Sequence, residues 1–85
     1  MSDIYKTVYR NVIFQAIRDL AGASPVEKDA AIKYLHSNAF VQHCAVAEFP
    51  EGLQDALDEM LLMSRSEQKV VSKMLMDAIT EELPA

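Results

Sequence analysis

The sequence predicts an all-α protein, a compact bundle of about five short helices in a single domain. Three observations carry this prediction. Apolar residues recur at helical spacing along most of the chain, and residues typical of helix caps separate these stretches. No stretch alternates between apolar and polar residues for long enough to predict a strand. With 85 residues and no linker-like tract, one domain is expected over residues 1–85.

The first helix is expected over residues 3–21. Its apolar residues at steps of three and four are Tyr5, Tyr9, Val12, Ala16 and Leu20, and Val8, Ile13 and Ile17 widen this stripe. Gly22 is expected to end the helix in the left-handed conformation that glycine adopts without strain.

The second and third helices are expected over residues 25–36 and 39–47. Ser24, Pro25 and Glu27 form a capping-box pattern, with proline at the first helical position where its missing N–H costs nothing. Ser37 and Asn38 are cap-forming residues before the third helix. The residues expected to face the core are Val26, Ala30 or Ala31, Tyr34, Leu35, Phe40, Val41, Cys44 and Ala45.

The fourth and fifth helices are expected over residues 50–63 and 66–82. A residue before proline is pushed out of the helical region, so Glu48-Phe49-Pro50 should end the third helix, with Pro50 opening the fourth. Residues 64–67 give a second capping-box pattern, and Pro84 should end the last helix. The residues expected to face the core are Leu53, Ala56, Leu57, Met60, Leu61, Val70, Val71, Met74, Leu75, Ala78 and Ile79.

Acidic residues gather in the second half of the chain. Residues 1–46 carry five Lys or Arg against four Asp or Glu, whereas residues 47–85 carry three against nine. The expected acidic face consists of Glu48, Glu51, Asp55, Asp58 and Glu59. Such a face either is only solvated or docks on a basic surface of a protein partner, and it repels phosphate.

The central pair of helices, over residues 39–63, has the order of a helix-turn-helix. The second helix of a DNA-binding pair offers Arg, Lys, Asn or Gln to base edges, but here it offers mainly carboxylates. Nucleic-acid binding through this helix is therefore disfavoured. The alternative function is a DNA-binding regulator that uses basic residues of the first two helices, namely Lys6, Arg10, Arg18, Lys28 and Lys33.

Methionines are concentrated in the last two helices, at Met60, Met63, Met74 and Met76. Methionine fills irregular gaps in cores and also lines adaptable binding grooves. The four residues therefore belong either to the core or to an apolar seam of a homodimer. The apolar fraction of 51% is high for so small a domain, and this favours a homodimer.

Residues that could support catalysis or metal binding are few. His36, His43 and Cys44 do not share a helical face in a metal-ligand spacing, and the two glycines cannot form a phosphate-binding loop. No metal, cofactor or catalytic residue is expected, and the protein is not expected to be an enzyme. The single cysteine excludes an internal disulfide.

The beginning of the chain does not have the pattern of a signal peptide, because residues 1–10 include charges and lack a continuous apolar run. No stretch approaches the roughly 20 apolar residues of a membrane-spanning helix. A cytoplasmic location is expected, without membrane association.

The first half of the chain resembles a group of small phage- and prophage-encoded proteins of unassigned function. The residues that carry the resemblance are YRNVIFQAIRD at 9–19, AAIKYL at 30–35 and FVQHC at 40–44. The chain departs from that pattern at Tyr34 in place of tryptophan, at His43 in place of valine, and at Glu48-Phe49-Pro50 in place of a glycine-containing turn. The resemblance implies a mobile-element setting and transfers no catalytic residue. The leading hypothesis is a small non-enzymatic protein in the host cytosol that modulates a host or phage protein by binding it, because the acidic residues suit docking on a basic surface.

Overall fold

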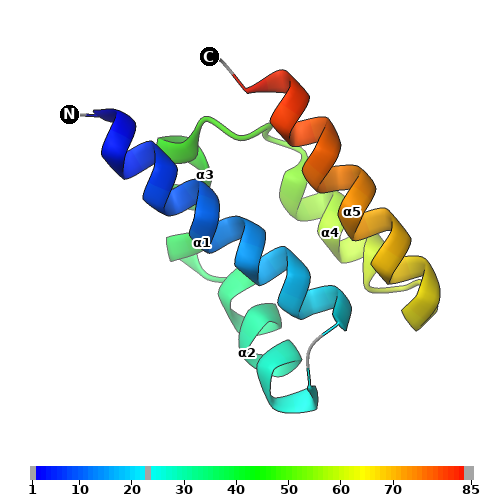
Figure 1. Ribbon diagram of the computed structural model, residues 1–85. Helices are drawn as coiled ribbons and strands as arrows, with labels where there is room; N and C mark the ends of the chain where they lie inside the picture. The colour runs from blue at the N-terminus through cyan, green and yellow to red at the C-terminus, as the bar shows by residue number, and fades with distance from the viewer. Residues whose placement is uncertain (1, 23, 84–85) are drawn as a thin grey trace.

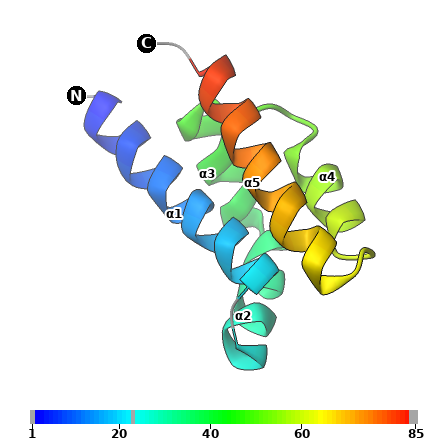
Figure 2. The same ribbon diagram turned by 45° about the vertical axis from the view of Figure 1, so that its right-hand side comes forward.

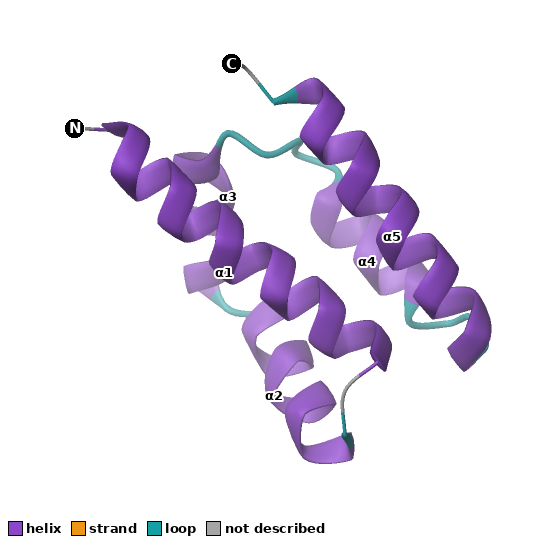
Figure 3. Cartoon of the chain, in the orientation of Figure 1, coloured by secondary structure: helices purple, strands orange, loops and turns teal. Residues whose placement is uncertain are grey.

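The computed structural model describes residues 2–22 and 24–83, and its regular structure is entirely helical (Figure 1). The five helices are α1 (Ser2–Gly22), α2 (Pro25–Leu35), α3 (Asn38–Ala47), α4 (Leu53–Met60) and α5 (Arg65–Glu82). Short loops connect them, and no strand occurs in the described part of the chain (Figure 3). The prediction of an all-α bundle is confirmed.

Helix α1 is the centre of the arrangement, because it packs against α2, α3 and α5, while α4 packs against α5. Figures 1 and 2 show α1 and α5 side by side and running in opposite directions, so that the beginning of α1 and the end of α5 lie at the same end of the molecule. The helix-turn-helix-like pairing expected for residues 39–63 is not the dominant packing, since α3 lies mainly on α1 and α4 on α5.

The buried apolar residues form one cluster to which every helix contributes. The largest side chains with almost no exposed surface are Ile13, Ile17, Leu20, Leu35, Phe40, Leu57 and Met60. Ile13, Ile17 and Leu20 follow one another at steps of four and three along α1, so a single face of this helix supplies the middle of the cluster.

Side-chain caps begin three of the helices, as the sequence predicts. The Ser24 hydroxyl accepts from the Glu27 backbone N–H at 3.4 Å, and the Ser37 hydroxyl accepts from that of Phe40 at 3.3 Å. At α5 the capping box is complete, because Glu67 also accepts from the Ser64 backbone N–H at 3.1 Å. These bonds satisfy amide groups that have no partner within their own helix.

The fourth helix is shorter at both ends than the predicted range 50–63, and Pro50 does not open it. Helix α4 begins at Leu53 with Gly52 at its N-cap, and no side-chain hydrogen bond caps it. Glycine weakens a helix interior by about 1 kcal/mol relative to alanine, which favours a turn through Gly52 instead. At the other end, the backbone N–H groups of Leu62 and Met63 donate three residues back, and this tighter turn ends the helix.

Gly22 does not have the predicted left-handed conformation, because it is the last helical residue of α1 and neither glycine has a positive φ. The left-handed residue is Glu48, with φ of 62°, after the last residue of α3. The backbone N–H of Glu48 donates to Ala45, and that of Phe49 donates to Cys44, which is the Schellman arrangement. Pro84, predicted to end the last helix, lies outside the described residues.

Several residues predicted to face the core lie on the surface instead. The clearest are Val26, Val41, Val70 and Met74, with exposed fractions of 80%, 56%, 60% and 63%. Tyr5, Val12, Ala45 and Ala78 are also exposed, whereas Ala31, one of the two alternatives predicted for α2, is buried. The helices carry apolar residues over more than one face, so spacing alone does not decide which face is buried.

Among the described helices, none has the length and apolar character needed to cross a membrane.

Candidate partner-binding surface

Helix α4 separates an apolar face from an acidic one. Leu53, Leu57 and Met60 are buried in the core, at steps of four and three residues. Asp55 and Glu59, one turn apart on the other side of the helix, are exposed. The burial of the apolar face fixes the direction in which these two carboxylates project.

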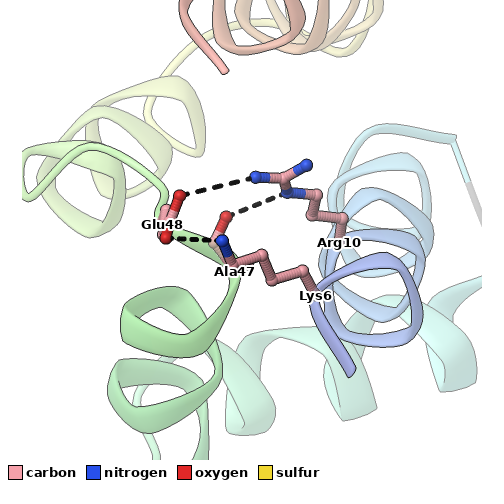
Figure 4. Close-up of polar contacts among 4 residues, drawn as sticks. All are labelled: Lys6, Arg10, Ala47 and Glu48. Carbon is pink, nitrogen blue, oxygen red and sulfur yellow. Dashed lines mark hydrogen bonds and ion pairs between the residues drawn. The ribbon is translucent and has the colours of Figure 1, made fainter. Parts of the chain in front are cut away.

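Glu48 belongs to a contact between α1 and the end of α3 rather than to an open acidic face (Figure 4). Its carboxylate accepts from Lys6 Nζ at 2.8 Å and lies 3.9 Å from an Arg10 guanidinium nitrogen. The hydrogen bond from Lys6, with the charges of Lys6 and Arg10, lowers the pKa of the Glu48 carboxyl from its usual value. Arg10 Nε also donates to the Ala47 carbonyl at 2.9 Å, where α3 ends.

These two cations explain how a non-glycine residue comes to lie at a left-handed position. The left-handed region costs roughly 1–2 kcal/mol for a residue with a Cβ atom. The ion pairs of the Glu48 carboxylate and the bond from Arg10 to Ala47 hold the turn in place and oppose that cost. The sequence does not reveal this contact, because it joins residues about forty positions apart.

Asp58 also has a partner, since its Oδ1 lies 2.6 Å from His36 Nε2. Of the five predicted acidic residues, Glu51, Asp55 and Glu59 are exposed and form no hydrogen bond or ion pair with another described residue. Leu62, one turn beyond Glu59, is the most exposed large apolar residue described, at 88%. We call Glu51, Asp55, Glu59 and Leu62 the α4 surface.

The four methionines of the predicted seam do not lie together on one surface. Met60 is completely buried in the core, and Met76 is half-buried against it. Met63 and Met74 are exposed at 40% and 63%. Met60 therefore fills the core and has no surface to offer to a second copy.

His43 is held in an aromatic cluster rather than lying free on the surface. Its Nδ1 lies 2.7 Å from the Tyr34 hydroxyl, and its ring stacks on Tyr9 with centroids 4.5 Å apart. Burial, followed by the charges of Cys44 and Tyr9, raises the pKa of Tyr34 to about 12. Burial likewise raises the pKa of the Cys44 thiol to about 11. A thiol with that pKa is almost entirely protonated near neutral pH, which opposes nucleophilic chemistry.

Metal-ligating side chains do not gather anywhere in the described residues, where no three His, Cys, Asp or Glu side chains surround a possible metal position. The aromatic cluster brings together one imidazole, one thiol and two phenols, without a carboxylate that would orient the imidazole.

Most basic residues of the first two helices are engaged within the molecule. Lys6 and Arg10 bind Glu48, and Lys33 lies 3.3 Å from Asp29. Lys28 Nζ donates to the Gln68 side chain at 2.8 Å. Contacts with phosphates would have to compete with these bonds, which weakens the DNA-binding alternative.

No protein-family model, curated protein or solved structure matches the chain.

Proposed function

We propose that this is a small non-enzymatic protein, of the phage or prophage type, that modulates a protein partner by binding it through the α4 surface. The observation that carries the proposal is a set of three exposed carboxylates. Asp55 and Glu59 lie on the outer side of a helix whose other side is anchored in the core, and Glu51 lies in the turn before this helix. The partner offers a basic surface, of the kind that also holds nucleic acid.

The α4 surface supplies the two contributions that such binding needs. Carboxylates facing cations steer the encounter and disfavour partners of the wrong charge. Burial of an apolar residue adds affinity, and Leu62 is the residue of this surface with the most apolar area to lose. The net charge of −5 extends the attraction beyond the contact itself.

The test is a comparison of two charge-reversal variants in affinity capture from host lysate, with identification by mass spectrometry. Asp55→Lys/Glu59→Lys changes the α4 surface. Asp77→Lys/Glu81→Lys makes the same change of net charge on an exposed one-turn pair of α5, and it serves as the matched control. A partner that depends on the α4 surface is retained by wild type and the α5 variant, and its capture by the α4 variant falls at least tenfold.

The salt dependence of capture and the binding of duplex DNA test the proposal further. Capture through exposed charges weakens between low and moderate ionic strength, because the Debye length falls to about 10 Å at 0.1 M salt. Equal capture by both variants, or salt-sensitive retention of duplex DNA in a gel-shift titration, contradicts the proposal. The second result would favour the DNA-binding alternative.

A further inference from the structure

A cavity of about 310 Å³ lies where the end of α1 meets the beginnings of α2 and α5. Its volume is at the lower end of the range of small-ligand sites, which is roughly 300–1,000 Å³. Two of its lining side chains are cations, and none of the described lining residues carries a carboxylate. We call this cavity the basic pocket, and the described residues that line it are Ala21, Gly22, Pro25, Lys28, Arg65 and Gln68.

An uncharged partner holds the ammonium group of Lys28 in place. Its Nζ donates to Gln68 Oε1 at 2.8 Å. Gln68 is only 4% exposed, and its Nε2 donates to the carbonyls of Leu61 and Met63 at 3.3 and 3.1 Å. An ammonium group has three donors, and an amide oxygen does not compensate its charge. Lys28 therefore lines the basic pocket as an oriented cation with two donors left.

Arg65 supplies the second cation. It is the first residue of α5, its side chain is exposed, and it forms no hydrogen bond or ion pair with another described residue. Lys6, Arg10 and Lys33 differ from this pair, because each of them lies beside a carboxylate. The basic pocket thus brings together two uncompensated cations in a chain whose net charge is −5.

We propose that the basic pocket binds a phosphate group, free or as a monoester, between the Lys28 ammonium and the Arg65 guanidinium. A phosphate monoester carries about −1.5 to −2 charge near neutral pH, which matches two cations. A carboxylate carries a single charge and would leave one cation uncompensated. Lysine and arginine both form charge-assisted hydrogen bonds to phosphate oxygens, and these are stronger than neutral ones.

The helix ends around the pocket change this balance little. Two amino ends and one carboxyl end meet there, and at roughly half a charge each they sum to about +0.5. The carboxylates of the two first turns, Glu27 and Glu67, bind the cap residues Ser24 and Ser64 and do not line the pocket. They offset the helix ends, so the two cations supply most of the attraction.

An NMR titration of the whole chain tests the site. Sodium phosphate, replacing sodium chloride at constant ionic strength near neutral pH, should shift the backbone amide signals of Gly22, Lys28 and Gln68 and saturate at millimolar concentration. Phosphoserine in a parallel titration distinguishes the two sources of the group. Tighter binding of phosphoserine indicates a monoester, and equal or weaker binding indicates free phosphate.

Charge variants separate the site from general electrostatics. Arg65→Glu should abolish the saturable shifts with an unchanged far-UV circular dichroism spectrum, because a carboxylate suits the first turn of a helix. Lys28→Gln should weaken binding about tenfold, the loss expected for one charge-assisted bond. Lys73→Glu makes the same change of net charge at an exposed position two turns further along α5, and this matched control should bind phosphate as wild type does.

Three results would overturn the proposal: no saturable shift with phosphate or phosphoserine, equal binding by wild type and Arg65→Glu, or an equal loss in Lys73→Glu and Arg65→Glu. No residue of the α4 surface lines the basic pocket, so the phosphate site and the proposed function can fail independently.

Discussion

At the scale of single residues, the structure gives roles to side chains whose surroundings the sequence leaves open. Glu48 is the clearest case, because it was predicted as part of an open acidic face and instead binds Lys6 and Arg10. Cys44 is the second case. It lies half-buried near Tyr34. Burial is the main cause of the raised pKa in both residues. These effects depend on distances between helices, which residue spacing within one helix does not contain.

The raised pKa of Cys44 leads to a prediction on stability at alkaline pH. A thiol whose pKa is about 11 when folded and 9.0 in its ordinary state holds its proton more tightly in the folded chain. Its contribution to stability is complete below about pH 9 and is lost as the pH rises through about 11. We expect the wild type to lose about 1 kcal/mol of unfolding free energy relative to Cys44→Ala over this range. This is less than a full two-unit shift would give, since the thiol is half-exposed and screened.

Urea unfolding of both proteins at a series of pH values measures this difference directly. The titrations of lysines occur in both proteins and cancel in the comparison, whereas Tyr34, whose pKa of about 12 depends partly on Cys44, titrates above this pH range. If the unfolding free energies of wild type and Cys44→Ala change in parallel from pH 8 to pH 11, burial does not hold the proton on Cys44.

At the scale of the helices, the sequence predicts where helices begin better than it predicts where they end. Each of the hydroxyl caps at Ser24, Ser37 and Ser64 accepts from a backbone N–H three positions away. Such caps are therefore visible in the local sequence, and each lies where predicted. The ends of α1 and α3 are less predictable, because helix ends also depend on contacts with other helices. The turn at Glu48 is held by two cations of α1, and glycine is helical at Gly22 where a left-handed end was predicted.

Gly22→Ala separates the predicted conformation of this residue from the observed one. A methyl group added at Gly22 would meet no atom within 4 Å, and the backbone there is helical. We therefore expect the variant to be more stable by about 0.4–1 kcal/mol, because alanine restricts the unfolded chain more than glycine does. Thermal or urea unfolding measures the change. Destabilisation of similar size would mean that Gly22 has the left-handed conformation after all.

At the scale of the whole molecule, the sequence predicts the number and type of helices but not which apolar face of each is buried. Helix α1 shows why. Its two apolar stripes, one through Ile13 and Ile17 and one through Val8 and Val12, both have helical spacing. The first lies in the core and the second faces outward, a choice made by how α3 and α5 pack on α1. The candidate surfaces were predictable only in part for the same reason.

Because all five helices share one cluster around α1, they should unfold together. Ile17 is completely buried in this cluster, so Ile17→Ala should cost about 2–5 kcal/mol of unfolding free energy. A chain of this length has only about 4–13 kcal/mol in total, so the variant should approach the limit of stability. Far-UV circular dichroism in urea should show one transition shifted to lower urea. Val41→Ala, at an exposed position of α3, should stay within about 0.5 kcal/mol of wild type.

Hydrogen exchange on the Ile17→Ala variant supplies the decisive observation. If the amides of α4 and α5 remain protected while those of α1, α2 and α3 exchange, the α4–α5 pair is stable by itself, and the shared cluster is not what unites the fold.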